Sequence, residues 1–182
     1  MFLRSGRVRA FLPLVIIIAV FVSAIAWTTW ARANHVFPFC ATAIWDTNWT
    51  PRRVGNLTKS SDLILIGNIA QVGPSWQPEV GPIITRITVN SSEVLKGGQW
   101  PRTQVSLVVS GGSIGCYSDS VGGEASFTKG ELVVVFLIAA PEGVRVTNGI
   151  QGKYTISDGT ANSQYSGPVS LQDLRNEIAQ NL

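Results

Sequence analysis

Short apolar and alternating segments, separated by glycine and proline, run through the middle of this 182-residue chain. Residues 63–72 form an apolar run that stops at Gly73 and Pro74, which are residues typical of turns. From 83 to 89 apolar residues alternate with polar ones, which is the period of a strand with one buried face. The same segment continues to Leu95, just before a pair of glycines. Both segments predict β-strands.

Later segments predict further strands. Alternating apolar residues at 105–109 indicate a third strand. Residues 132–138 are apolar at every position and too few to span a membrane, which predicts a central strand covered on both faces. Shorter apolar segments follow at 144–147 and 154–156. Five or six closely spaced short strands predict a mainly β fold, in the form of a small OB-like five-stranded barrel.

The period changes at the end of the chain, where the pattern predicts a short amphipathic helix. Ser170 is a suitable N-terminal cap, and Asp173 stands at the third helical position. Four residues form one apolar face at helical spacing: Leu171, Leu174, Ile178 and Leu182. Because the polar face holds one arginine and no lysine, packing on the barrel is favoured over a free helix on a membrane surface.

The opposite end of the chain carries an export signal. Arg4, Arg7 and Arg9 precede the uncharged apolar stretch from Phe11 to Trp27. Arginines before such a stretch remain on the cytoplasmic side, so the rest of the chain is expected outside. Membrane-interface residues in this interpretation are Arg4, Arg7, Arg9, Trp27 and Trp30.

Two fates of this leader remain open. The stretch is 17 residues long, near the lower limit for a membrane span, and Trp27 and Trp30 stand where an interfacial aromatic belt would lie. Small residues at 24–26 and 31–33 also fit signal-peptidase sites. The protein is therefore expected in the cell membrane as a single-pass protein with its domain outside, or secreted if the leader is cleaved.

These patterns divide the chain into three regions. Residues 1–33 are a signal peptide or single transmembrane anchor, residues 34–60 an extended lead-in, and residues 61–182 the OB-like domain with its C-terminal helix. The lead-in contains prolines and aromatic residues without a period. Its Trp45 and Trp49, four residues apart, fit a helical turn or a partner-binding face, although packing onto the domain is the favoured interpretation.

Loops at 73–82 and 110–127 add further candidates for contacts with a partner. The possible partner-binding residues are Trp45, Trp49, Trp76 and Tyr117.

The distribution of charged residues along the chain argues against a nucleic-acid partner. Four of the 14 basic residues lie in the first 33 positions with no acid among them, which leaves 10 basic against 11 acidic residues in the remainder. The basic character of the whole chain therefore belongs to the leader. A nucleic-acid partner, which would require a basic patch on the folded domain, is not expected.

The chain has two cysteines, Cys40 and Cys116. In the oxidising compartment that the leader indicates, a disulfide between them is favoured over two free thiols. A bridge that closes so long a loop contributes about 4 to 5 kcal/mol in the chain-entropy model.

Candidate catalytic chemistry is sparse. The single histidine, His35, lies next to the leader, so a Ser-His-Asp or Cys-His arrangement and a zinc ligand set have little to draw on. Asp119 and Glu124 are close in sequence, but solvated loop carboxylates are favoured over a glycosidase pair or a weak cation site. We expect neither an enzyme nor a cofactor or metal.

Several segments, taken in order, resemble the netrin-like module of the tissue inhibitors of metalloproteinases. These segments are 61–69, the strand ending at Glu93-Val94-Leu95-Lys96-Gly97, Gly115-Cys116, and 127–137. In that family the order accompanies an OB-fold, and a bridge from Cys40 to Cys116 would match the family disulfide that ties the lead-in to the barrel. Uncharacterised bacterial secreted or membrane-anchored proteins share these features, and the chain resembles those more closely.

The chain also departs from the inhibitors. They expose a mature N-terminal cysteine that binds the protease zinc, whereas either cleavage site leaves residues ahead of Cys40. The further disulfides of the family have no counterpart here. We therefore expect a non-catalytic module that binds another envelope or extracellular protein, or serves a structural role. The alternative is a netrin-like metalloprotease inhibitor.

Overall fold

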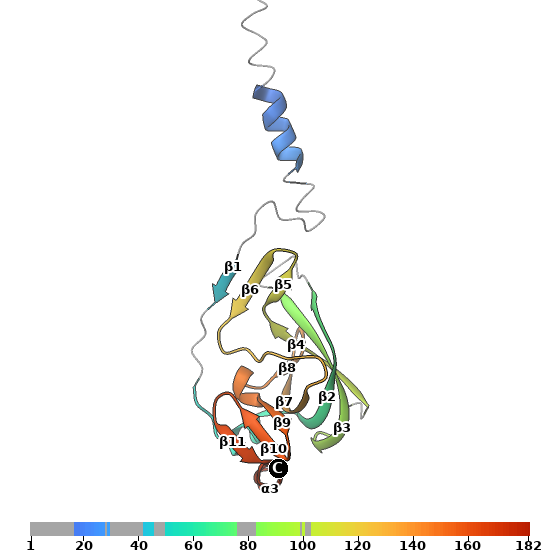
Figure 1. Ribbon diagram of the computed structural model, residues 1–182, viewed down its shortest axis with the longest axis vertical. Coiled ribbons are helices and arrows are strands. Elements are labelled where there is room, and N and C mark those ends of the chain that lie inside the picture. Colours follow the sequence, from blue (N-terminus) through green and yellow to red (C-terminus); the bar gives the residue numbers. More distant parts are fainter. Residues whose placement is uncertain are drawn as a thin grey trace, which may run out of the picture. The chain divides into compact units, whose positions relative to one another are not determined.

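The computed structural model contains two compact units, residues 1–41 and 42–182, and each is described by itself. The structure describes residues 17–27, 29, 42–45, 50–75, 83–98, 100 and 103–182 (Figure 1). In the first unit residues 17–27 are helical and exposed, Trp27 included. Among the described residues, no helix combines the length and apolar character that a membrane crossing requires.

The remaining leader residues singled out from the sequence, Arg4, Arg7, Arg9 and Trp30, lie outside the described residues. A signal peptide or anchor at 1–33 therefore stays a prediction.

The second unit is mainly β, as predicted, and its centre is a ring of five strands. The strands of this ring are β2 (Leu63–Ser75), β3 (Ile84–Lys96), β4 (Gln104–Ser110), β7 (Leu132–Ala140) and β8 (Gly143–Val146). They pair in the order β7-β2-β3-β4-β8, and β8 pairs again with β7. All these pairings are antiparallel except that between β4 and β8.

The five strands of the ring correspond to five segments predicted from the apolar pattern. One boundary differs, because β2 continues through Gly73 and Pro74, where the sequence predicts a stop. Both residues pair with β3, whereas β7 covers the other side of β2 only as far as Asn68. Proline is tolerated there because the second edge of the strand needs no N–H donor.

Strands outside the ring were only partly predicted. The predicted strand at 154–156 is β9 (Lys153–Ser157), which pairs with β7, and the short polar strands β10 (Thr160–Ser163) and β11 (Gly167–Ser170) extend the sheet beyond it. A second sheet has the order β1-β6-β5 and consists of β1 (Thr42–Trp45), β6 (Tyr117–Val121) and β5 (Gly112–Ile114). Its strands lack an apolar period, so the sequence predicts loops for β5 and β6 and an extended lead-in for β1.

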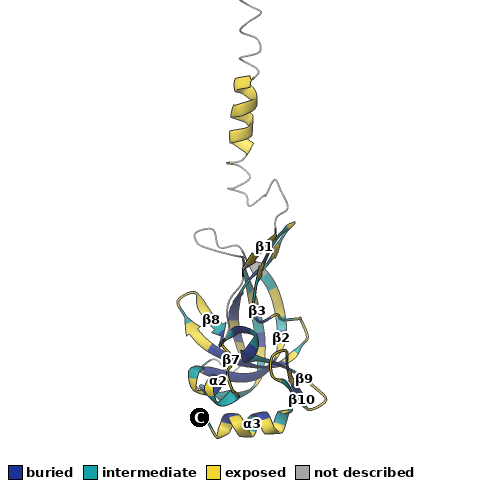
Figure 2. Ribbon diagram, turned by 90° about the vertical axis from the view of Figure 1, so that its left-hand side faces the viewer, coloured by how far each residue is buried: buried dark blue, intermediate teal, exposed yellow. Residues whose placement is uncertain are grey.

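β7 lies between two apolar cores, which confirms the prediction of a central strand covered on both faces (Figure 2). Val133, Val135 and Leu137 belong to the first core, which fills the ring. Val134 and Phe136 belong to the second, which lies under the two helices. All five side chains are fully buried.

The two helices cover the second core. α3 (Leu171–Ala179) confirms the predicted C-terminal helix: the amide of Asp173 donates to the Ser170 hydroxyl at 3.0 Å, and Leu174 and Ile178 are buried. The prediction was wrong for Leu182, which is 66% exposed because the helix ends before it.

α2 (Val54–Ser60) corrects the extended lead-in predicted for 34–60. This segment has one large apolar residue in its middle, Leu57, and so shows no helical period in the sequence. Leu57 and Thr58 are buried, and Lys96 Nζ donates to the Thr58 carbonyl at 2.7 Å near the end of the helix. Tertiary contacts therefore stabilise a helix that the local pattern does not indicate.

Neighbouring residues of β7 test the burial of this strand. Leu137→Ala removes a fully buried side chain and is expected to lower the free energy of unfolding by about 2–5 kcal/mol. Ile138→Ala, at a position 37% exposed, is expected to cost about 1 kcal/mol. Urea unfolding of the full chain, followed by circular dichroism, measures both changes. Equal losses would contradict the assignment of Leu137 to the core.

Candidate functional site

The ring opens at one end into a cavity of about 320 Å³. Ile87, Val109 and Ala125 belong to the first core and also line this cavity, so its floor is the top of that core. We call it the mouth cavity. Its other lining residues are Val72, Thr85, Ser110, Gly111, Gly112, Asp119, Ser120, Val121, Glu124, Ser126 and Phe127.

Asp119, on β6, is the most buried charged residue of the mouth cavity, with 4% of its surface exposed. Its Oδ2 accepts a hydrogen bond from the amide of Ile83 at 2.7 Å, which directs the carboxylate toward the start of β3. Its Oδ1 is buried and has no hydrogen-bond partner in the described part of the chain. A buried acceptor without a donor is costly, so a donor that reached this oxygen would stabilise it.

The backbone beside Asp119 packs tightly. Gly111 has a φ of +99°, and a Cβ atom there would lie 3.0 Å from the carbonyl oxygen of Asp119. The Thr85 hydroxyl donates to the Gly111 carbonyl at 2.6 Å, and the Gly111 amide donates to the Ile83 carbonyl at 2.6 Å. These contacts hold the turn after β4 and the strand β6 against the start of β3.

An ion-pair cluster around Arg145 holds two of the residues that line the cavity, Glu124 and Ser110. The guanidinium of Arg145 donates to Glu124 at 2.6 Å, to Ser110 at 2.8 Å and to Glu142 at 2.7 Å. Burial raises the pKa of Glu124, and the charge and hydrogen bonds of Arg145 offset part of that effect. Glu124 is therefore paired with Arg145. Asp119 is the carboxylate of this cavity that has an oxygen without a hydrogen-bond partner among the described residues.

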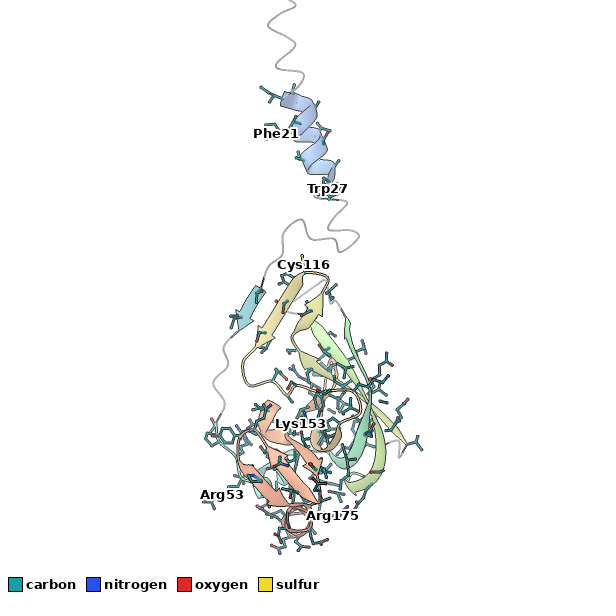
Figure 3. All side chains as sticks on the ribbon, viewed as in Figure 1. Phe21, Trp27, Arg53, Cys116, Lys153 and Arg175 are labelled. Carbon is teal, nitrogen blue, oxygen red and sulfur yellow. The ribbon has the colours of Figure 1, made fainter. Side chains whose placement is uncertain are left out.

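A second ion pair anchors the far end of the segment 121–131, which forms one wall of the cavity. Lys153 is labelled in Figure 3. Its Nζ donates to Glu131 at 2.7 Å and to the Ser126 carbonyl at 2.5 Å, and it lies 4.8 Å from the centroid of the Phe127 ring. The Thr155 hydroxyl also donates to Glu131. Burial acts to raise the pKa of Glu131, but Lys153, Thr155 and the Thr128 amide outweigh it and lower that pKa.

Asp119 and Glu124 line the same cavity, which corrects the interpretation of both as solvated loop carboxylates. Asp119 is buried and Glu124 half-buried because β5, β6 and the segment after them fold back over the ring, and the glycine-rich sequence does not indicate this packing. Sequence reasoning also missed Arg145. The β7–β8 hairpin pairs it with Ile138 and brings it to Glu124, 21 positions earlier in the chain.

Among the partner-binding candidates, Tyr117 is the one whose side chain the structure describes. It begins β6, two residues before Asp119, and the hydrogen bond that its phenol donates to the Asp119 carboxylate, followed by burial and the carboxylate charge, raises the pKa of that phenol. Trp45 lies in β1, whereas Trp49 and Trp76 lie outside the described residues. Tyr117 is not among the residues that line the mouth cavity, but its phenol contacts the Asp119 carboxylate that does.

Cys116 lies in the turn between β5 and β6 (Figure 3) and is not a free thiol. Its predicted partner, Cys40, is outside the described residues, so the bridge between them stays a prediction.

Removing the charge of Glu131 tests the anchored wall. Glu131→Gln is expected to lower the free energy of unfolding by about 2 kcal/mol at neutral pH, because Lys153 loses its partner. The pKa of Glu131 is lower in the folded than in the unfolded chain, so its contribution is present above the ordinary value of 4.5 and is lost as the pH falls through the lowered pKa. The difference between wild type and variant should therefore shrink in acid.

Urea unfolding at a series of pH values measures this difference, and Glu177→Gln, at an exposed position of α3, is the control. A difference that stays constant between neutral pH and about pH 3 would contradict the role of the Glu131 charge.

A scan against models of known protein families finds none that matches this chain, and a search of curated proteins gives no match. The netrin-like resemblance therefore remains an expectation from the sequence. The function is best inferred from the mouth cavity, with its anchored wall and its buried Asp119 carboxylate.

Proposed function

We propose that this protein is a non-catalytic, extracytoplasmic binding module that contacts another envelope or extracellular protein through the mouth of its ring. The exported location is inferred from the arginines and the apolar leader of the sequence. The mouth cavity carries the proposal, because open ends of β-barrels are common binding sites and this one combines apolar walls with a buried carboxylate.

The ring supports an OB-like barrel as the scaffold. β2, β3 and β4 are consecutive neighbours, and β7 returns beside β2, which is the Greek-key order. β8 closes the ring through β4 and β7, and a five-stranded Greek-key barrel is the form that an OB-fold takes.

The partners of the two carboxylates favour binding over catalysis. Glu124 is held by Arg145, and Asp119 accepts the amide of Ile83 and stands next to Tyr117. Glu124 also bonds Ser110, and the guanidinium of Arg145 holds both side chains in place, which favours a structural role of this carboxylate over general-base catalysis.

Cross-linking from the hairpin β5–β6 tests the proposal. A photo-reactive amino acid in place of Ser113, which is exposed on β5, is expected to cross-link a discrete partner in native membranes. Ser157 is the matched control because it is also an exposed serine with one side-chain hydrogen bond of 3.2 Å, but on β9. Gel shifts and mass spectrometry of the adducts provide the measurement. The same adducts from both positions, or none from Ser113, would contradict a binding role of the mouth.

We also propose that Cys40 and Cys116 form the disulfide that ties the segment before β1 to the ring domain. β1 and β6 pair in parallel with Thr42 opposite Ser118, and each of these residues follows one of the cysteines by two positions. If the pairing of the two strands continues for two more residues, Cys40 lies opposite Cys116, and the Cα–Cα distance across paired strands fits the distance that a disulfide needs.

Peptide mapping of the unreduced full chain is expected to yield one linked peptide that contains both cysteines, and alkylation should require a reductant. Alkylation of either thiol in the folded, unreduced protein would rule the bridge out. The same maps identify the N-terminus. A chain that begins at Cys40 would favour the metalloprotease inhibitor, and a chain with residues ahead of Cys40 would favour the binding module.

A further inference from the structure

We infer that the mouth cavity binds one alkylammonium group, the chemistry of a lysine side chain of the partner protein. This inference rests on the proposed binding role of the mouth and adds the chemical class that the mouth recognises. It starts from the Asp119 carboxylate, which has one oxygen bonded to the Ile83 amide and the other buried without a partner.

The charge of the site requires a cation. Asp119 is 4% exposed, no basic residue is among those that line the described cavity, and Arg145, which bonds the lining residue Glu124, is also paired with Glu142. A buried carboxylate without a compensating charge is destabilising, and a hydrogen-bond donor with a positive charge relieves that cost. A cationic ligand is therefore favoured over a neutral one or an anion.

The number of available oxygens selects an ammonium among the cations. A guanidinium binds a carboxylate best through two parallel hydrogen bonds, but Oδ2 of Asp119 is occupied by Ile83. Calcium takes six to eight oxygen ligands, which one free carboxylate oxygen and a few hydroxyls supply poorly. An ammonium has three donors on a single nitrogen and can use Asp119 Oδ1, once a small shift of the buried carboxylate turns it into the cavity, together with neighbouring hydroxyl oxygens.

Hydroxyl oxygens stand beside the carboxylate. Thr85, Ser110, Ser120 and Ser126 line the cavity together with Asp119. The Thr85 hydroxyl donates its proton to the Gly111 carbonyl at 2.6 Å, so its oxygen is oriented as an acceptor toward other groups. These oxygens complete the coordination of an ammonium group.

Apolar walls account for the alkyl part of the ligand. Val72, Val109, Val121 and Phe127 line the cavity, and lysine side chains commonly bury their methylene stem against apolar surface while the charged end reaches a polar group. The cavity volume of about 320 Å³ lies at the lower end of the range for ligand sites, which suits one side chain.

Titration of the full chain with n-butylammonium chloride tests the inference. Amide shifts of Gly111 and Gly112 in nuclear magnetic resonance spectra are expected to move saturably. Asp119→Asn keeps an acceptor for the Ile83 amide but removes the charge, and it should weaken binding by about 10- to 100-fold. Asp62→Asn is the matched control, because Asp62 Oδ2 also accepts a backbone amide, that of Ala139 at 2.9 Å, yet Asp62 does not line the cavity.

Further probes separate the alternatives. 1-Butanol, n-butylguanidinium and calcium chloride should each bind at least tenfold more weakly than n-butylammonium. Equal binding of any of them, or equal binding by wild type and Asp119→Asn, would overturn the inference. Nα-acetyl-lysine amide, which keeps the charged ε-ammonium group, should bind at least as tightly as n-butylammonium. Failure of this probe to bind would exclude a lysine side chain as the ligand.

The cross-link from Ser113 distinguishes this inference from the proposed function. If the cross-link forms equally with Asp119 and with Asn at that position, the mouth binds a partner but not through an ammonium group, and the inference fails alone. If n-butylammonium binds wild type and no cross-link forms, the cavity recognises the cation and the protein-binding role fails. Loss of the cross-link in Asp119→Asn, with Asp62→Asn unaffected, supports both.

Discussion

The burial of β7 on both faces is the constraint on which the rest of the domain depends. The alternate side chains of this strand enter two separate cores, one inside the ring and one under the helices. Its edges pair with β2 on one side and with β8 and β9 on the other. A strand that is apolar at every position is stable in water only with such cover, so the ring and the helix layer are two consequences of one sequence feature.

The same strand positions the candidate site. β8 and β9 follow β7 and pair with it, and each carries one basic residue that reaches the segment 121–131. Arg145 binds Glu124, and Lys153 binds Glu131. Ion pairs that are largely withdrawn from water hold geometry better than exposed ones, because breaking one leaves an unpaired charge behind. The segment 121–131, which forms a wall of the mouth cavity, is thus held by β8 and β9, and the pairing of these strands with β7 fixes their position.

The spacing of apolar residues predicted the secondary structure correctly where the buried face of an element gives the sequence a regular pattern. The strands β2, β3, β4 and β7, and the faces of α3 that hold Leu174 and Ile178, follow from alternation or helical spacing in the sequence. Elements stabilised mainly by contacts with distant residues were missed. The helix α2 has one apolar anchor, Leu57, and the strands β5 and β6 are short and rich in glycine and serine, so neither has a local pattern.

The sequence by itself determined that the domain is mainly β, that its central strand is buried on both faces, and that a capped helix closes the chain, because each of these depends on the order of apolar and polar residues. It also predicted an export leader from the arginines and the apolar stretch near the start of the chain. Only the tertiary structure decided that Asp119 and Glu124 line the mouth of a ring, that Glu124 is paired with Arg145, and that one oxygen of Asp119 lacks a donor. The charge state and partners of a carboxylate depend on which distant strands fold over it, and no local pattern records that.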